Sequence, residues 1–199
     1  MARHRDERID QSVLAAVTAL LREVGYTALT MEAIAQRAGT TKPAIRRRWK
    51  SQKQLVVAAL AEERTGVAEM DTGCTSCDLV GHLEALRVGM ADPALGNVLP
   101  ALTADLADDP ELRKEFLAVV WEPRREACVE SLRKGEARGE IRSGLDIDLL
   151  MDLFAAPIVF RVLFGHRELD RKFVRDVVSG VLSGVGATDG DGLCEHVGP

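Results

Sequence analysis

The most chemically distinctive side chains of the sequence are cations that cluster between residues 42 and 53. Arg46, Arg47 and Arg48 are consecutive, and Lys50 follows two residues later. A guanidinium group can hold guanine O6 and N7 through two hydrogen bonds, and a lysine ammonium group suits a phosphate. A run of cations more often forms a solvated surface without a ligand. Whether these side chains bind nucleic acid therefore depends on the secondary-structure element that carries them.

Two short helices are predicted around the cations, over about residues 31–38 and 42–49, with the tight turn Gly39-Thr40-Thr41 between them. Thr30 is suited to cap the first helix. Pro43 falls in the first turn of the second, where its missing N–H removes no helical hydrogen bond. This is a helix-turn-helix pattern, whose second helix enters the major groove of DNA. The predicted DNA contacts are Thr30, Thr40, Thr41, Lys42, Pro43, Arg46, Arg47, Lys50 and Lys53.

The distribution of charge separates the two ends of the chain. Residues 1–61 carry 11 Lys and Arg against 5 Asp and Glu, whereas residues 62–199 carry 15 against 26. A basic end on an acidic body indicates that one module meets a polyanion. We therefore predict a DNA-binding domain over residues 1–61, a helical domain over residues 62–187 and a disordered tail over residues 188–199.

The stretch from Arg8 to Leu60 resembles the DNA-binding domain of the tetracycline-repressor (TetR) family. The resemblance rests on Gly25-Tyr26, Thr30 to Ala35, Ala38 to Ile45, and Arg48 to Ser51. It implies a dimeric transcriptional regulator with a helical C-terminal region that binds a small effector. Two positions depart from the family pattern, which commonly has Tyr in place of Arg46 and Lys in place of Gln52.

The rest of the chain predicts an all-α fold of about nine helices, since helical periodicity recurs through to residue 185. Pro100, Pro123 and Pro157 interrupt predicted helices, and bent helices often leave cavities. A pocket with an apolar lining suits a hydrophobic ligand, although each lining residue alone is as well explained as ordinary core. The predicted effector contacts are Met90, Leu99, Leu102, Phe116, Val120, Trp121 and Phe154.

The final predicted helix carries two adjacent apolar rows between Phe173 and Val185. Gly180 and Gly184 would let another backbone approach closely, so we expect this helix and the one before it to form a four-helix bundle with a second copy. The alternative is that both rows pack inside one protomer. The predicted interface residues are Leu153, Phe160, Phe173, Val177, Val178, Val181 and Leu182.

Cys74 and Cys77, with His82 nearby, raise the possibility of a thiol redox or metal site. A single cysteine pair lacks a second pair, so we predict no metal site and take surface thiols as the simplest interpretation. A redox- or metal-responsive regulator is the alternative to one with an organic effector. A helical binding protein that never contacts DNA is a third.

Several classes of protein are not expected. The sequence has no glycine-rich phosphate loop, nucleophile elbow or metal-ligand helix motif, so we predict neither an enzyme nor a bound cofactor. No apolar run approaches the roughly 20 residues that span a bilayer. The N-terminal residues lead into an amphipathic segment rather than a signal peptide, which favours a cytoplasmic protein with no membrane partner.

Overall fold

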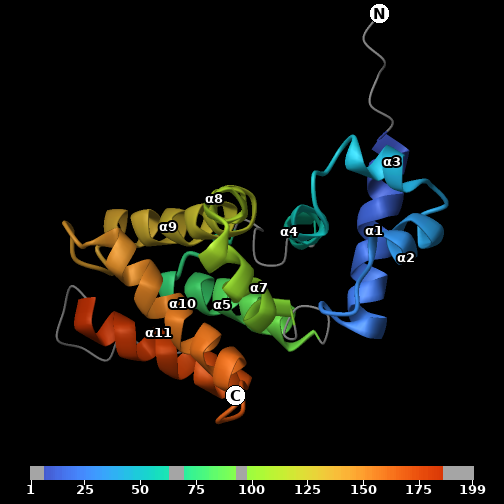
Figure 1. The fold of residues 1–199 in the computed structure, drawn as a ribbon. Helices are drawn as coiled ribbons and strands as arrows, with labels where there is room; N and C mark the ends of the chain where they lie inside the picture. Colours follow the sequence, from blue (N-terminus) through green and yellow to red (C-terminus); the bar gives the residue numbers. More distant parts are fainter. Residues whose placement is uncertain (1–6, 63–69, 93–97, 186–199) are drawn as a thin grey trace, which may run out of the picture. The chain divides into compact units, whose positions relative to one another are not determined.

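The computed structural model describes residues 7–62, 70–92 and 98–185, shown as coloured ribbon in Figure 1. These residues are predominantly helical, which confirms the all-α fold class. The predicted disordered tail over residues 188–199 lies outside them. The chain forms two compact units, the first from residues 1–64 and 92–120 and the second from residues 65–91 and 121–199.

The first unit contains the predicted helix-turn-helix. Its helices are α1 (Glu7–Val24), α2 (Met31–Arg37), α3 (Lys42–Arg46), α4 (Gln52–Glu62), α7 (Val98–Asp108) and α8 (Pro110–Phe116). The apolar stripe of α1 is buried against α2 and α4, with Val13, Val17, Ile34 and Leu55 in its core. By packing, α7 and α8 therefore join the N-terminal helices, although they follow residue 61 in the sequence.

The second unit is built on α5 (Thr75–Ala91), which packs against α9 (Glu122–Ala137), α10 (Ile147–Phe164) and α11 (Arg171–Val185). Asp146 and Asp170 accept hydrogen bonds from backbone N–H groups in the first turns of α10 and α11. Gly165 ends α10 in the left-handed conformation, with φ of 57°. The helix α5 begins about four residues before Leu79, where the sequence predicted its start. Its first helical hydrogen bond runs from the Asp78 N–H to the Cys74 carbonyl oxygen.

Two of the prolines expected to interrupt helices lie near the starts of α7 and α9. Pro123 cannot donate a hydrogen bond, and its ring would crowd the carbonyl four residues earlier in a regular helix. The wide π-helical turn η1 (Leu117–Trp121) ends two residues before it and joins α8 to α9, so the interruption expected at this proline is present. Pro100 is the third residue of α7, and the residues directly before that helix lie outside the described part of the chain, so the interruption expected at Pro100 stays a prediction.

With α8, η1 and α9 counted as one continuous helix, the described residues form the nine helices that the sequence predicted. Within residues 7–62, 70–92 and 98–185, no helix is both long enough and apolar enough to cross a membrane.

Candidate functional site

The helix-turn-helix begins each of its two helices at a threonine. Thr30 accepts a hydrogen bond from the Ala33 N–H at 3.1 Å, and Thr41 accepts one from the Ala44 N–H at 3.3 Å. Each hydroxyl can still donate its own hydrogen. Gly39 takes a φ of 61° in the turn between them, which a residue with a side chain rarely adopts.

Burial fixes which side of α3 faces outward. Ala44, Ile45 and Trp49 are buried in the core of the first unit. Arg46 and Arg47 are consequently exposed, as is Lys50 in the turn that follows. The helix is shorter than predicted, because it ends at Arg46 and not at Trp49.

Arg48 points in a different direction from its two neighbours. Its Nε lies 2.5 Å from Asp10 Oδ1, and its Nη1 donates to the Ala44 carbonyl oxygen at 3.1 Å. Only 15% of each charged side chain of the pair is exposed. Arg48 thus ties α1 to the end of α3, and the exposed arginines of the triplet are Arg46 and Arg47.

Two predicted lysine contacts have partners inside the first unit. Lys42 forms an ion pair with Glu32, and this hydrogen bond lowers the pKa of the Glu32 carboxyl. Lys53 Nζ lies 2.5 Å from Asp105 Oδ1 on α7, and Tyr26 donates its hydroxyl to the other oxygen of the same carboxylate. Lys53 therefore links α4 to α7, and its role as a phosphate ligand stays a prediction.

The other predicted DNA contacts remain accessible. Thr30, Thr41, Pro43, Arg46, Arg47 and Lys50 are exposed, and Thr40 is half-buried. The Tyr26–Asp105–Lys53 cluster escaped the sequence reasoning, because Asp105 is separated from its partners by 79 and 52 positions in the chain.

The predicted dimer residues fall into two groups. Val178 and Leu182 are buried inside the second unit, together with Val174, so these two predicted interface residues were wrong. Phe173, Val177 and Val181 are half-buried on the neighbouring row of α11, and Gly180 and Gly184 would meet no atom within 4 Å if a Cβ were added. On α10, an exposed apolar row contains Leu149, Leu153, Phe160 and Phe164.

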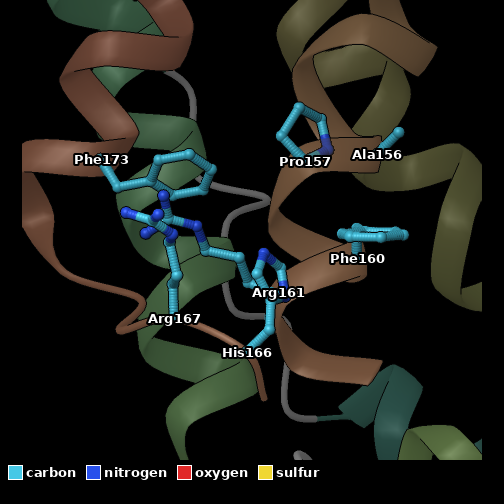
Figure 2. A pocket seen from close by; sticks show the side chains of 7 residues that line it. All are labelled: Ala156, Pro157, Phe160, Arg161, His166, Arg167 and Phe173. Carbon is cyan, nitrogen blue, oxygen red and sulfur yellow. The ribbon is translucent and has the colours of Figure 1, made fainter. Parts of the chain in front are cut away.

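An open pocket of about 650 Å³ lies on this side of α10 and α11. Figure 2 shows Pro157 and Phe160 on α10 and Phe173 on α11, with Arg161 and Arg167 between the helices. The Arg161 guanidinium lies 3.3 Å from the centre of the Phe173 ring, a cation–π contact. The His166 ring packs edge-on against Phe160 with ring centres 5.2 Å apart.

The predicted effector residues are divided between the two units. Leu102 and Val120 are buried in the core of the first unit, and Phe116 packs against them. Phe154 is buried in the core of the second unit. Met90, Leu99 and Trp121 are half-buried. Val120 and Trp121 belong to the π-helical turn η1, and Phe116 directly precedes it.

Two family profiles match the chain. The profile described as "Bacterial regulatory proteins, tetR family" matches residues 13–59, which include the helix-turn-helix. The profile described as "Tetracyclin repressor-like, C-terminal domain" matches residues 69–181, more than half of the chain. The two matches follow each other along the sequence, so they agree on both parts of the protein.

Whole-length relatives agree with the profiles. The chain is 32% identical over 187 residues to the uncharacterized HTH-type transcriptional regulator YdeS of Bacillus subtilis, with 94% of each protein covered. It is 27% identical over 180 residues to the DNA-binding transcriptional repressor TetR of Mycobacteroides abscessus, covering 89% of this chain and 94% of the relative. Among solved structures, the TetR family transcription regulator SCO0332 matches with a TM-score of 0.75 and 28% identity, over 89% of this chain and 98% of its own.

Proposed function

Because this chain belongs to the TetR family of helix-turn-helix transcriptional regulators, we propose that it is a cytoplasmic, dimeric repressor that leaves its operator when a small, largely apolar effector binds. The observation that carries the proposal is the outward projection of Arg46 and Arg47 from α3, whose opposite side is buried. Two guanidinium groups on a protruding helix are suited to guanine edges in a major groove. Lys50, Thr30 and Thr41 are exposed beside them and are suited to phosphate oxygens.

DNA binding by the chain is tested with the DNA upstream of its own gene. We expect the wild-type protein to shift this DNA in a gel, and the double variant Arg46→Ala/Arg47→Ala to bind at least about 100-fold more weakly, since each guanine contact is worth about 1–3 kcal/mol. Arg113→Ala/Arg133→Ala is the matched control, because it removes the same charge from exposed positions on α8 and α9. Thermal unfolding confirms that both variants fold.

The proposal of a DNA-binding regulator fails if the wild-type protein binds neither this fragment nor any sequence selected from a random library. It also fails if the control variant loses as much affinity as the α3 variant, because binding would then follow total charge and not the helix-turn-helix.

A second copy is the proposed partner for the exposed apolar row on α10. Leu149, Leu153, Phe160 and Phe164 recur at intervals of three or four residues, or their sums, and therefore line one side of the helix. Phe173 on α11 lines the same open pocket as Phe160, Val177 and Val181 follow Phe173 on successive turns of α11, and two glycines leave room for a backbone. Two such surfaces facing each other would make the four-helix interface and set the spacing of two recognition helices.

The π-helical turn η1 supports the choice of Phe116, Val120 and Trp121 as effector contacts, since such wide turns occur frequently at functional sites. These side chains are apolar or aromatic, which favours a hydrophobic effector. Release from DNA then requires that the effector favour a dimer shape whose two recognition helices are wrongly spaced.

Trp121 provides a probe for the effector site, because the chain has only one other tryptophan, Trp49. In a Trp49→Phe background, we expect the apolar dye 1-anilinonaphthalene-8-sulfonate to bind saturably and to quench the emission of Trp121 by energy transfer. Phe116→Ala should weaken dye binding about tenfold, the loss of one aromatic contact. Saturable binding that leaves Trp121 emission unchanged would place the apolar site elsewhere.

A further inference from the structure

The first turn of α5 carries two cysteines that the proposed function does not use. The Asp78 N–H donates to the Cys74 carbonyl oxygen at 3.0 Å, so Cys74 is the residue that opens the helix. The Cys77 N–H donates to Cys74 Sγ at 3.4 Å. The Cys74 sulfur therefore lies against the backbone of Cys77, in the first turn of the helix.

The separation of the two residues suits a disulfide bond. Positions three apart in a helical turn have Cα atoms about 5 Å apart. Disulfides join Cα atoms that are about 4.4–6.8 Å apart. Cys74 and Cys77 are both half-buried, so neither residue is enclosed in the core of the second unit. A bond between them needs no movement of one helix relative to another.

The surrounding polar contacts hold this turn in place. Asp78 Oδ1 accepts hydrogen bonds from the Thr72 N–H at 2.9 Å and from the Thr72 hydroxyl at 2.8 Å. Between the two cysteines, the Thr75 N–H donates to Glu140 Oε2 at 2.8 Å, and Arg138 donates to the Thr75 hydroxyl at 3.0 Å. The turn that carries the two cysteines is thereby held by Thr72, which precedes it, and by Arg138 and Glu140 at the end of α9.

The third residue of the sequence pattern lies elsewhere. His82 is buried, and its Nε2 is 3.0 Å from the Ser131 hydroxyl on α9. Across the ranges 7–62, 70–92 and 98–185, no group of three or more His, Cys, Asp or Glu side chains is arranged to hold a metal ion. Two thiols are sufficient for a disulfide, whereas a protein zinc site generally uses three or four ligands.

We propose that Cys74 and Cys77 are a peroxide-reactive pair that forms a reversible intrahelical disulfide. One thiol loses its proton, and the thiolate attacks a peroxide oxygen. The O–O bond breaks, the leaving hydroxide takes up that proton, and a sulfenic acid and water result. The second thiol attacks that sulfur, the S–O bond breaks, and a second water leaves as the S–S bond forms. Two thiols lose two hydrogens in total, and one hydrogen peroxide is reduced to two waters.

Cys128 is the internal comparison for this reactivity. Burial raises the pKa of its thiol to about 12, so at neutral pH it carries almost no thiolate and should resist peroxide. The contrast makes the proposal specific to the α5 pair. It does not depend on DNA binding or on the nature of the effector.

The test is mass spectrometry of the whole protein, treated with hydrogen peroxide, blocked with N-ethylmaleimide and then digested with trypsin. The peptide over residues 65–87 contains Cys74 and Cys77 and no other cysteine. We expect it to lose the mass of two hydrogens and to take up no maleimide, and dithiothreitol should restore both thiols. Cys128 should remain fully labelled, and Cys128→Ser should behave as the wild type.

Single variants test the pairing. Cys74→Ser and Cys77→Ser should not lose the two hydrogens, and the cysteine that remains should be trapped by dimedone as a sulfenic acid. The proposal is overturned if the 65–87 peptide keeps both thiols under these conditions, if its cysteines bond instead to Cys128 or Cys194, or if all cysteines react equally.

Discussion

The consecutive arginines Arg47 and Arg48 differ in their exposure to solvent and in their contacts. Arg47 is exposed, whereas Arg48 reaches Asp10 on α1 and the Ala44 carbonyl. The sequence predicted the cluster of charge and its place on the second short helix. It also predicted Arg46 and Arg47, and not Arg48, as DNA contacts, but it did not predict the ion pair of Arg48, because that depends on a carboxylate 38 positions away.

The two arginines should separate stability from DNA binding. Arg48→Ala removes an ion pair and a hydrogen bond that are largely shielded from solvent, so we expect it to lower the free energy of unfolding by about 2 kcal/mol. Arg47→Ala should leave that free energy within about 0.5 kcal/mol of wild type, as exposed substitutions usually do, and should weaken DNA binding. Urea unfolding measures the free energy of unfolding of each variant, and equal losses in the two variants would contradict the assigned roles.

At the scale of the element, the sequence could predict those helix starts that depend only on nearby residues. The caps at Thr30, Asp109 and Asp146 each bind an N–H three residues ahead, so the sequence contains the whole interaction. The π-helical turn was predictable only as an interruption, since Pro123 marks a place of strain but not how the chain relieves it. The carboxylate of Asp105 could not be paired with Tyr26 and Lys53, because nothing local connects them.

Asp105 should make the stability of the first unit depend on pH. Burial raises the pKa of its carboxyl, but the hydrogen bonds from Lys53 and Tyr26 outweigh burial, so the pKa lies below its ordinary value. A carboxyl whose pKa falls on folding stabilises the protein above the unfolded pKa, and this contribution is lost as the pH falls through the folded pKa.

We therefore expect Asp105→Asn to lower the free energy of unfolding at pH 7 by about 1 kcal/mol, a modest value because the Lys53 side chain is 45% exposed and water screens the pair. The difference from wild type should begin to shrink below about pH 4, where the carboxyl of the unfolded chain becomes protonated, and should be lost once the pH falls below the folded pKa. Unfolding curves at several pH values measure it. Glu136→Gln, at an exposed site on α9, is the control and should show no such trend.

At the scale of the whole molecule, the sequence predicted an all-α chain but not how its helices group. The helices α7 and α8 belong by packing to the unit that contains the helix-turn-helix, a grouping carried by the contacts of α8 with α4 and of Asp105 with Lys53. The two apolar rows of α11 were both predicted at an interface. One is used by the core of its own protomer, because α5 packs against it.

Association should depend on the apolar row of α10. Leu153→Glu places a charge in the proposed interface, which is costly to bury, so we expect a dimer to become a monomer of 21.6 kDa and to lose most of its affinity for DNA. Val88→Glu is the matched control, since Val88 on α5 is 52% exposed and Leu153 is 45% exposed. Light scattering after gel filtration measures the mass. A wild-type protein that is monomeric at micromolar concentration would contradict the expectation.

The internal pairing of cations in the first unit has a consequence for how operator affinity responds to ionic strength. Arg37, Lys42, Arg48 and Lys53 already face carboxylates of the same protomer, whereas no carboxylate among the described residues pairs with Arg46, Arg47 or Lys50. Only cations that neutralise phosphates displace condensed counterions from the duplex, and about six such groups in a dimer correspond to a logarithmic slope of about −5. Engagement of every Lys and Arg in residues 1–61 would give a slope near −20, so a salt titration counts how many of the protein's positive charges the nucleic acid meets.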